Sequence, residues 1–205
     1  PYLGPKYSTD VIKKELQNYN KKLIYNKLSE DEIISVVANA ISNGKVVAWF
    51  EGRLEFGARA LGHRSILADP TNGEMKSRIN KIVKKREGFR PFAPMVTKEK
   101  QHDFFEMTDD VPYMNQVVQV KPQFRDILKA VTHVDGSARV QTVYKNTLIH
   151  KLLEEFELVS GYPILLNTSF NVKDKTMVLT PKDAIDTFFD TEMDLLVIGN
   201  HVLYK

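Results

Sequence analysis

The chain is predicted to fold as one α/β domain of the mixed α+β type, with a largely mixed or antiparallel sheet flanked by helices. Its 205 residues, 42% of them apolar, are enough for one hydrophobic core and too few for two large domains. A helix signal that leads directly into a dense apolar strand opens an α/β unit near residue 30. Further along, helices alternate with pairs of strands, and no segment repeats another.

The first 28 residues carry the weakest signals for a buried core. Ser8 begins a Ser-Thr-Asp run that can cap a short helix through residue 19, and residues 22–26 favour a short strand. We expect this segment to contribute little to the core. Residues 1–28 are therefore interpreted as a linker or adaptor, and residues 29–205 as the domain itself.

The domain opens with a strong helix-start signal. Ser29 and Glu32 have the spacing of a capping box, in which each side chain satisfies a backbone N–H of the other residue. Apolar residues follow at helical spacing until Asn43-Gly44, which ends the helix. Residues 45–50 then form a β-branched and aromatic run that is too short for a helix, which predicts a buried strand.

The rest of the chain alternates between helix and strand signals. Asp135-Gly136 predicts the turn of a hairpin that joins residues 130–134 to residues 139–144. We expect the remaining helices at residues 72–85, 98–105, 148–159 and 181–189, an extended segment at 91–94, and the remaining strands at 66–68, 113–120, 162–166, 195–198 and 202–204.

The positive charge of the chain is concentrated in one segment. The net charge is +3, but residues 53–90 contain ten Lys and Arg against four Asp and Glu, so the rest of the chain is slightly acidic. A local positive excess of this kind is what an anion-binding site needs. The alternative is a basic helix face that is simply solvated.

Residues 51–65 place three glycines and three arginines directly after the predicted strand. Glycine lets the backbone approach a ligand, and the guanidinium of Arg53, Arg59 or Arg64 can bind a carboxylate or phosphate at two points. The spacing is that of neither a Walker loop nor a GxGxxG fingerprint. The alternative is a strained turn whose arginines pair with Glu51, Glu55 and Glu87.

Three more groups of polar residues are candidates for a site. Lys84-Lys85-Arg86 ends the predicted helix over 72–85, where its charges would also complement the helix dipole. Arg139 lies on the predicted hairpin. Residues 167–171, Asn-Thr-Ser-Phe-Asn, follow a buried strand, a position that suits ligand binding in an open sheet and turn formation equally.

Several functional classes are not supported. The five histidines are scattered without metal-site spacing, no GxSxG elbow is present, and no apolar run is long enough to span a bilayer. The chain has no cysteine and shows no export leader, which predicts a cytoplasmic protein. We expect no protein metal site, and expect any Mg²⁺ to arrive with a nucleotide.

Four segments resemble a known family. Residues 56–70, 90–94, 131–143 and 167–171, in this order, resemble the C-terminal domain of the NodU-type carbamoyltransferases, which include nodulation-factor and antibiotic O-carbamoyltransferases. The resemblance implies a YrdC-like twisted sheet that binds ATP, with Mg²⁺, and carbamoyl phosphate and forms carbamoyl-adenylate. It also implies a missing N-terminal actin-like domain, which residues 1–28 would follow and which would pass the carbamoyl group to a hydroxyl of a small-molecule or glycan acceptor.

The resemblance also implies roles for individual residues. Lys84-x-Arg86 and Ser169-x-Asn171 resemble paired phosphate-binding signatures. The residues expected in catalysis are Arg59, Lys84, Arg90 and Arg139, and those expected to bind the nucleotide are these four with Arg86, Asn167, Ser169 and Asn171. The chain departs from the family at Ala58, where proline is frequent, and at residues 172–175, where a glycine turn is frequent.

Two alternative functions remain open. A YrdC-like domain could instead make threonylcarbamoyl-adenylate for tRNA modification, which would require threonine and bicarbonate. The basic segment could also belong to an RNA-binding module, although its cations are not interleaved with aromatic residues as a stacking platform requires. Nucleic acid and membranes are not expected partners, and a face that a missing domain leaves exposed would also suit a homodimer.

Overall fold

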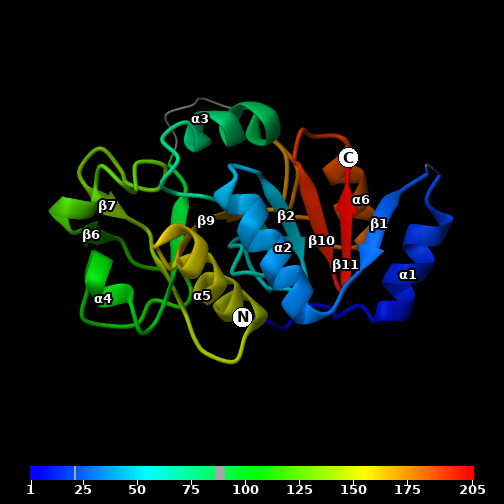
Figure 1. The fold of residues 1–205 in the computed structure, drawn as a ribbon, viewed down its shortest axis with the longest axis horizontal. Helices are drawn as coiled ribbons and strands as arrows, with labels where there is room; N and C mark the ends of the chain where they lie inside the picture. Colours follow the sequence, from blue (N-terminus) through cyan, green and yellow to red (C-terminus); the bar gives the residue numbers. More distant parts are fainter. Residues whose placement is uncertain (21, 86–90) are drawn as a thin grey trace.

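The structure is a computed structural model that describes residues 1–20, 22–85 and 91–205. In these residues an eight-stranded sheet has the strand order β1-β11-β10-β2-β3-β9-β4-β8, and a three-stranded sheet has the order β5-β6-β7. Two neighbouring pairs of the large sheet, β10 with β2 and β4 with β8, are parallel, and the others are antiparallel. The predicted mixed sheet with flanking helices is confirmed (Figure 1).

The elements have the following bounds. The helices are α1 Thr9–Asn18, α2 Glu30–Ser42, α3 Met75–Ile79, α4 Gln101–Phe104, α5 Leu148–Ser160 and α6 Pro181–Phe189, with a π-helical segment η1 Asn80–Lys84 and a 3₁₀ turn η2 Pro122–Phe124. The strands are β1 Ile24–Lys27, β2 Val47–Phe50, β3 Arg64–Ala68, β4 Ala93–Thr97, β5 Phe105–Glu106, β6 Val118–Val120, β7 Ser137–Ala138, β8 Gln141–Val143, β9 Ile164–Ser169, β10 Leu195–Ile198 and β11 His201–Tyr204.

Helices cover both faces of the large sheet. α2 and α5 pack side by side on one face, in front of the sheet in Figure 1, and close a core that includes Trp49 and Phe156. α1, α3 and α6 contribute to the core on the other face, together with Phe50 and Phe170. Because successive side chains of a strand point to opposite faces, residues of one strand contribute alternately to the two cores. No helix of the described residues is both long and apolar enough to cross a bilayer.

The first 28 residues belong to the core, so the expectation of weak packing is wrong. Ile12 and Leu16 on α1 are buried against the rest of the domain, and β1 pairs with β11 to form an edge strand of the large sheet. Tyr19 also donates a hydrogen bond to Asp186 on α6 at 2.7 Å. These contacts attach the segment firmly. The interpretation of residues 1–28 as the segment that follows another domain stays a prediction.

The predicted helix boundaries at α2 are confirmed. Ser29 and Glu32 form both bonds of the capping box, and Asn43 is the C-terminal cap. The predicted cap of α1 also holds, since the side chain of Ser8 accepts the N–H of Val11, and the predicted range 181–189 is that of α6. These signals succeed because a cap is satisfied within four residues and does not depend on the rest of the fold.

The predicted hairpin around Asp135 is wrong. Asp135 does sit in a tight turn, where its carboxylate accepts the N–H of Ser137 at 3.0 Å. The preceding residues 128–132 form helical turns instead of a strand, because the N–H of Thr132 bonds to the carbonyl of Leu128. β7 therefore pairs with β6, and β8 pairs with β4.

Two other predicted elements differ in extent. The predicted helix over 72–85 begins at Met75 and changes to π-helical geometry from Asn80 to Lys84, and it ends where Lys85 takes a left-handed conformation with φ of 45°. The predicted strand over 113–120 is reduced to β6. In both cases the local pattern was right in type, and the boundary was set by packing.

Candidate functional site

The residues predicted to form a site come together at one edge of the large sheet. β2 ends there, β3 and β4 begin there, and β9 ends there, since Phe50 pairs with Arg64, Ser65 with Ser169, and Ala93 with Asn167. The loop 51–63 and the end of η1 meet the same edge. The edge thus collects side chains from four separate stretches of the chain, which are residues 47–68, the end of η1, the start of β4 and the end of β9.

Lys84 forms the centre of a compact polar cluster. Its ammonium lies 2.6 Å from the carbonyl and 3.1 Å from the hydroxyl of Ser169, and 3.0 Å from the carbonyl and 2.7 Å from the amide oxygen of Asn171. Ser169 also donates its hydroxyl proton to the Asn171 amide oxygen at 2.6 Å. All of these oxygens are neutral, and together they hold the ammonium of Lys84 in a fixed position. We call these three residues the Lys84 cluster.

The loop after the Lys84 cluster closes on itself without a glycine. The side-chain amide of Asn171 donates to the carbonyl of Lys175 at 2.7 Å, and Asp174 takes a left-handed conformation with φ of 60°. Asp is among the non-glycine residues that tolerate this region best. The departure from the family pattern at residues 172–175 is therefore accommodated by a turn that holds Asn171 in place.

Arg59 and Arg139 form a second group of positive charge at this edge. Burial lowers the pKa of Arg139, and the neighbouring charge of Arg59 lowers it further. The Nε of Arg139 is buried and has no hydrogen-bond partner among the described residues, while Arg59 is exposed. Two guanidinium groups without a carboxylate partner in the described part of the chain favour binding of an anion.

Asn167 lies on β9 between the two groups of charge and is almost fully buried. Its amide nitrogen donates to the carbonyl of Ala60 and to the side-chain oxygen of Gln141, both at 2.9 Å. The side-chain oxygen of Asn167 has no partner within the described residues. Gln141 in turn donates to the carbonyl of Leu61 at 3.0 Å, so the two amides tie the sheet to the loop 51–63.

Arg64 has a different role from Arg59, although both belong to the same loop. The Nε of Arg64 donates to Glu55 at 2.9 Å, and both side chains are buried. The other oxygen of Glu55 accepts the backbone N–H groups of Leu61, His63 and Arg64 at 2.8, 2.9 and 3.1 Å. Burial would raise the pKa of Glu55, but these hydrogen bonds outweigh it and hold the pKa below its ordinary value. The alternative of arginines paired with loop carboxylates thus holds for Arg64.

Two predicted site residues, Arg86 and Arg90, lie outside the described residues. The other six are described, and the structure brings five of them together in two groups: Arg59 with Arg139, and Lys84 with Ser169 and Asn171. Asn167 lies two residues before Ser169 on the same strand. Their roles in binding or catalysis stay a prediction.

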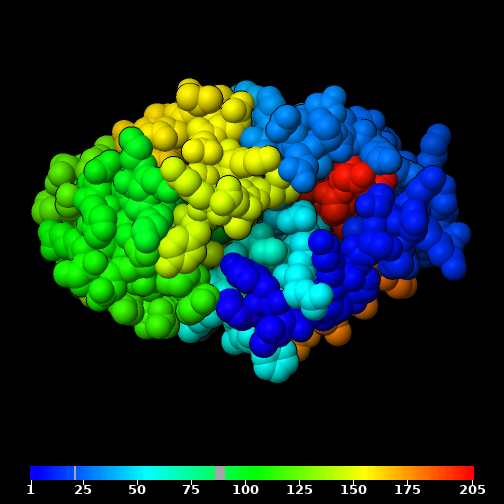
Figure 2. Space-filling model, turned by 90° about the horizontal axis from the view of Figure 1, so that it is seen from below, coloured from blue at the N-terminus to red at the C-terminus, as the bar shows by residue number. Residues whose placement is uncertain are grey.

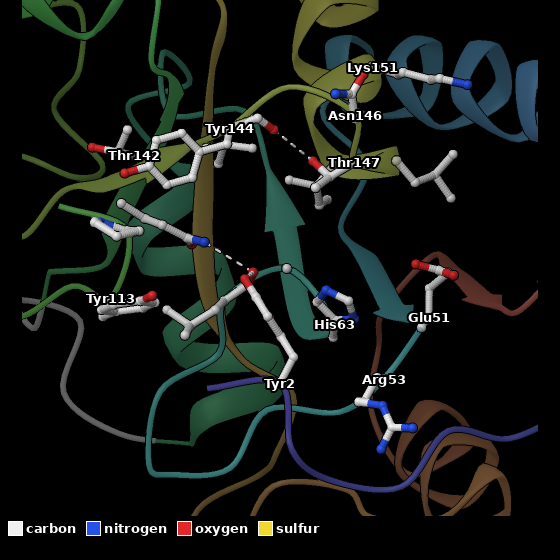
Figure 3. Close-up of a pocket in the computed structure, with 18 of the residues that line it drawn as sticks. Tyr2, Glu51, Arg53, His63, Tyr113, Thr142, Tyr144, Asn146, Thr147 and Lys151 are labelled. Carbon is white, nitrogen blue, oxygen red and sulfur yellow. Dashed lines mark hydrogen bonds between the residues drawn. The ribbon is translucent and has the colours of Figure 1, made fainter. Parts of the chain in front are cut away.

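A cavity of about 450 Å³ adjoins this edge, and sequence reasoning did not find it. Seen from below, the N-terminal segment, the segment around residue 52 and the segment around residue 146 meet on this face (Figure 2). Tyr113, Thr142 and Tyr144 line one side, and Glu51 and His63 lie opposite (Figure 3). Arg53, one of the three candidate arginines of residues 51–65, lines the cavity, whereas none of the described residues expected in catalysis or nucleotide binding does. Gln141 and Leu61 do line it, and they form the wall between the cavity and Asn167.

Aromatic and ionisable groups pack tightly on the lower side of this cavity. The ring of His63 lies over Gly52, where a Cβ would approach its Nδ1 to 2.6 Å, and its centroid is 4.4 Å from that of Tyr2. Burial raises the pKa of Glu51, and the neighbouring His63 and Lys6 partly offset this rise. Burial also raises the pKa of Tyr2, to about 12, and its hydroxyl donates to the carbonyl of Leu61 at 3.0 Å.

Glu51, His63 and Gln141 lie within the segments that the sequence singled out, but no spacing rule marked them as cavity residues. The position of Gln141 could have been predicted from the alternation of side chains between the two faces of the sheet. Val140 is buried in the core on the α1 side, so the next side chain, Gln141, must point to the α2 side. Tyr2 gave no signal, because its position depends on how the N-terminal segment crosses the domain. Among the described residues, no group of three or more His, Asp or Glu could hold a metal ion.

Comparisons with known proteins identify the family of this chain and agree with its fold. The family model described as "Carbamoyltransferase C-terminus" matches residues 38–205. Nodulation protein NolNO of Sinorhizobium fredii is 45% identical over 210 residues, and nodulation protein NolO of Bradyrhizobium diazoefficiens is 44% identical over 210 residues. Each match covers 100% of this chain, and 31% and 37% of the two relatives, so the chain spans about a third of their length.

Two solved structures share the fold. Full-length HypF in its phosphate- and nucleotide-bound form aligns over 86% of this chain and 22% of its own, with a TM-score of 0.59 and 18% identity. Sua5 of P. abyssi complexed with L-threonine aligns over 85% of this chain and 48% of its own, with a TM-score of 0.58 and 14% identity. The predicted likeness to YrdC-like domains is confirmed at the level of the fold. On the family match and the identities of its relatives, this chain belongs to the carbamoyltransferase C-terminus family.

Proposed function

We propose that this domain binds ATP and carbamoyl phosphate and forms carbamoyl-adenylate, the activated donor of a carbamoyl group. In the balanced reaction, water cleaves carbamoyl phosphate to carbamate and phosphate. A carbamate oxygen then attacks the α-phosphorus of ATP, the bond to the β-phosphate breaks, and pyrophosphate leaves. The carbamoyl group would finally pass to a hydroxyl of a small-molecule or glycan acceptor in a cytoplasmic reaction.

The observation that carries this proposal is the pair Arg59 and Arg139, which lie close enough to lower the pKa of Arg139 and have no carboxylate partner in the described part of the chain. Placing two cations together costs free energy unless an anion joins them. Lys84 adds a third positive charge that neutral oxygens hold in a fixed position. A triphosphate and an acyl phosphate are anions of the size and charge that such an edge would bind.

These residues can support adenylyl transfer without a protein nucleophile. Negative charge develops on the α-phosphate and on the leaving pyrophosphate, and fixed cations stabilise it because they need no reorganisation during the reaction. The three N–H groups of Lys84 already meet oxygens of Ser169 and Asn171, so Lys84 would exchange one of these oxygens for a phosphate oxygen when the nucleotide binds. Arg59 and Arg139 would neutralise the second phosphate-bearing substrate. Mg²⁺ would arrive bound to the nucleotide and supply further charge neutralisation.

The choice of acceptor belongs to the part of the relatives that this chain does not span. Because the chain matches about a third of the length of NolNO and NolO, we propose that the transfer step is completed with a preceding actin-like domain. We also propose that the isolated chain forms a homodimer, which gel filtration distinguishes from a monomer.

The test is pyrophosphate release from Mg-ATP by the purified chain, with and without carbamoyl phosphate. We expect release that depends on carbamoyl phosphate and that is lost in Arg59→Ala. Arg59 is exposed, so this variant should fold normally. Release that is independent of carbamoyl phosphate, or that persists in Arg59→Ala, would contradict the proposal.

Binding of ATP measured by calorimetry gives a second and independent test. Lys84→Met should weaken binding at least about tenfold, since a charged hydrogen bond to phosphate contributes roughly 1.5–3 kcal/mol. Lys81→Met is the matched control, because Lys81 lies one turn earlier on η1 and is exposed. Equal affinities of the two variants would exclude Lys84 from the nucleotide site.

The likeness to Sua5 complexed with L-threonine defines the alternative reaction to exclude. If threonine and bicarbonate replace carbamoyl phosphate in supporting pyrophosphate release, the chain makes threonylcarbamoyl-adenylate instead. An RNA-binding function would show as an affinity for RNA that falls steeply with salt and is insensitive to ATP.

A further inference from the structure

We propose that residues 1–6 act as a clamp on the loop 51–63, and that Tyr2 is a positioning residue that keeps Arg59 in place for ATP. The inference rests on the proposed function, since it names what holds the exposed arginine of the anion-binding edge. Residues 1–6 contact the loop on both sides of the stretch that carries Arg59. We call these six residues the clamp.

Backbone pairing attaches the clamp to the first half of the loop. The N–H of Gly4 donates to the carbonyl of Leu54 at 2.9 Å, and the N–H of Leu54 donates to the carbonyl of Pro5 at 3.0 Å. Lys6 and Arg53 form an antiparallel bridge, and the guanidinium of Arg53 donates to the carbonyl of Gly4 at 3.1 Å. The clamp therefore lies along the loop as a short additional strand.

A glycine permits this close approach. A Cβ at Gly4 would lie 2.9 Å from the carbonyl oxygen of Leu54 and 3.1 Å from its Cβ, which is too close for an ordinary contact. Leu54 is fully buried in the core and has no room to move aside. A larger residue at position 4 would push the clamp away from the loop.

The stretch that carries Arg59 is attached at two points, and the clamp holds both. Before this stretch, the N–H of Phe56 donates to the carbonyl of Pro1 at 2.6 Å. After it, the carbonyl of Leu61 accepts the hydroxyl of Tyr2 at 3.0 Å. Between the two points, residues 57–59 are exposed and make no hydrogen bond within the described part of the chain. The position of Arg59 is thus set by its neighbours.

Tyr2 is the only side chain of the clamp that reaches the second of these points among the described contacts. Side chains alternate along an extended segment, so Leu3 points outward and is 76% exposed, whereas Tyr2 points inward. Its ring centroid lies 4.4 Å from that of His63, and the two rings lie side by side below the cavity (Figure 3). The ring contact sets the direction in which the hydroxyl of Tyr2 points.

The sheet holds the second point as well, but from the other side. Gln141 donates to the carbonyl of Leu61 at 3.0 Å, and Asn167 donates to the preceding carbonyl, of Ala60, at 2.9 Å. If the hydroxyl of Tyr2 is removed, the carbonyl of Leu61 therefore keeps one donor. We expect the fold to survive this change and the stretch before residue 60 to loosen.

Electrostatic repulsion gives the clamp a physical task. Arg59 is close enough to Arg139 to lower the pKa of that side chain, and two like charges repel each other. A free stretch would carry Arg59 away from Arg139 until an anion joined them. A stretch that is fixed in advance keeps both cations in place, so the nucleotide does not have to order the loop when it binds.

The test measures the dissociation constant of Mg-ATP by calorimetry on the 205-residue chain. Tyr2→Phe keeps the ring against His63 and removes only the hydroxyl, so it should weaken binding about two- to tenfold, the range of one net hydrogen bond. Gly4→Ala, which displaces the clamp, should weaken binding at least as much.

Tyr7→Phe is the matched control. Tyr7 packs near Phe50, and its hydroxyl makes no hydrogen bond within the described residues. The same chemical change five residues further along should therefore leave the dissociation constant unchanged. Urea unfolding of each variant confirms that the folded state is the one measured.

A double-mutant cycle separates positioning from a general loss of order. If Tyr2 acts through Arg59, Tyr2→Phe should change the dissociation constant less than about twofold in an Arg59→Ala background, where there is no guanidinium to position. Weakening by the same factor in both backgrounds would overturn the role of Tyr2.

The remaining outcomes distinguish this inference from the proposed function. If the wild type binds ATP and Tyr2→Phe binds it equally well, the clamp is refuted and the proposed function stands. Equal weakening in Tyr7→Phe would refute the role of Tyr2 in the same way. If the wild type does not bind ATP, both proposals are refuted.

Discussion

Replacing Glu55 by glutamine should destabilise the domain strongly, because this carboxylate organises the loop 51–63. One oxygen of Glu55 accepts three backbone N–H groups and the other accepts the Nε of Arg64. In Glu55→Gln one of these oxygens becomes an NH₂ group, which then faces donors. The charge of Arg64 would also remain buried without its counterion.

The size of the effect follows from the burial of the pair. Removing one partner of a buried ion pair costs about 3–5 kcal/mol, more than an exposed pair would. For a domain of this length each kcal/mol lowers Tm by about 2–4 °C, so we expect a fall of about 6–20 °C. The folded pKa of Glu55 lies below its ordinary value of 4.5, so this stability is fully present above pH 4.5 and is lost as the pH falls through the folded pKa. The difference between wild type and variant should therefore shrink in acid.

Urea unfolding provides the assay, with fluorescence of Trp49 as the signal. Trp49 is the single tryptophan of the chain and is fully buried on β2. Glu51→Gln is the matched control, since it makes the same chemical change four residues away. Burial raises the pKa of Glu51, partly offset by His63 and Lys6, so its ionised form is destabilised in the fold at neutral pH.

The two variants should thus behave in opposite ways. Ionisation of the buried Glu51 lowers the stability of the wild type as the pH rises from 4.5 to the raised folded pKa. Glu51→Gln has no such charge, so its unfolding free energy at pH 7 should be unchanged or slightly raised. A cost below about 1 kcal/mol for Glu55→Gln, within the range of ordinary surface substitutions, would refute the reasoning. Equal costs for the two variants would refute it as well.

Two further predictions concern stability. Burial lowers the pKa of His201, so the contribution of neutral His201 to the unfolding free energy is fully present above pH 6.5 and is lost as the pH falls through the folded pKa. His201→Phe should therefore flatten the rise of the urea midpoint between pH 5 and 7, and an unchanged slope would contradict this. Gly52→Ala should destabilise the domain, since φ is +74° and the Cβ would lie 2.6 Å from Nδ1 of His63. Gly73→Ala, where a Cβ meets nothing within 4 Å, is its control and should be near neutral in the same melts.

The elements that the sequence predicted well are those whose signals are satisfied locally. The cap of Ser29 and the Asn43-Gly44 stop of the same helix needed no knowledge of the rest of the fold. The hairpin at Asp135 failed because its turn is local, whereas the choice of strand partners is not. Residues 130–134 form no strand, and β8 pairs with β4 instead, since competing pairings are decided by burial of both faces.

The packing of the first 28 residues could have been predicted more fully. Ile12 and Leu16 stand four residues apart on a helix whose other residues, apart from the exposed Val11, are polar, which is the spacing of a narrow buried stripe. The pairing of β1 with β11 had no comparable signal. An edge strand with one buried neighbour carries few apolar residues, so its composition resembles that of a linker.

The candidate site was predicted in part for a different reason. The contact between Lys84 and Ser169 joins residues 85 positions apart, and it was expected only from the resemblance to a family. Residue type alone could not distinguish the three arginines of the loop. Arg64 is buried with Glu55, whereas Arg59 is exposed, because the chain turns back toward Glu55 only after residue 60.

The buried ion pair of Glu55 with Arg64 also orders the backbone of the loop 51–63. Glu55 binds the N–H of Leu61, and the carbonyl of Leu61 accepts from Gln141 and from the hydroxyl of Tyr2. A loop held only by its ends would let these peptide groups rotate, and Gln141 would then lose the carbonyl that orients its side-chain amide. The buried ion pair of Glu55 therefore stabilises more than a turn, since it fixes the direction of the carbonyl that both Gln141 and Tyr2 bind.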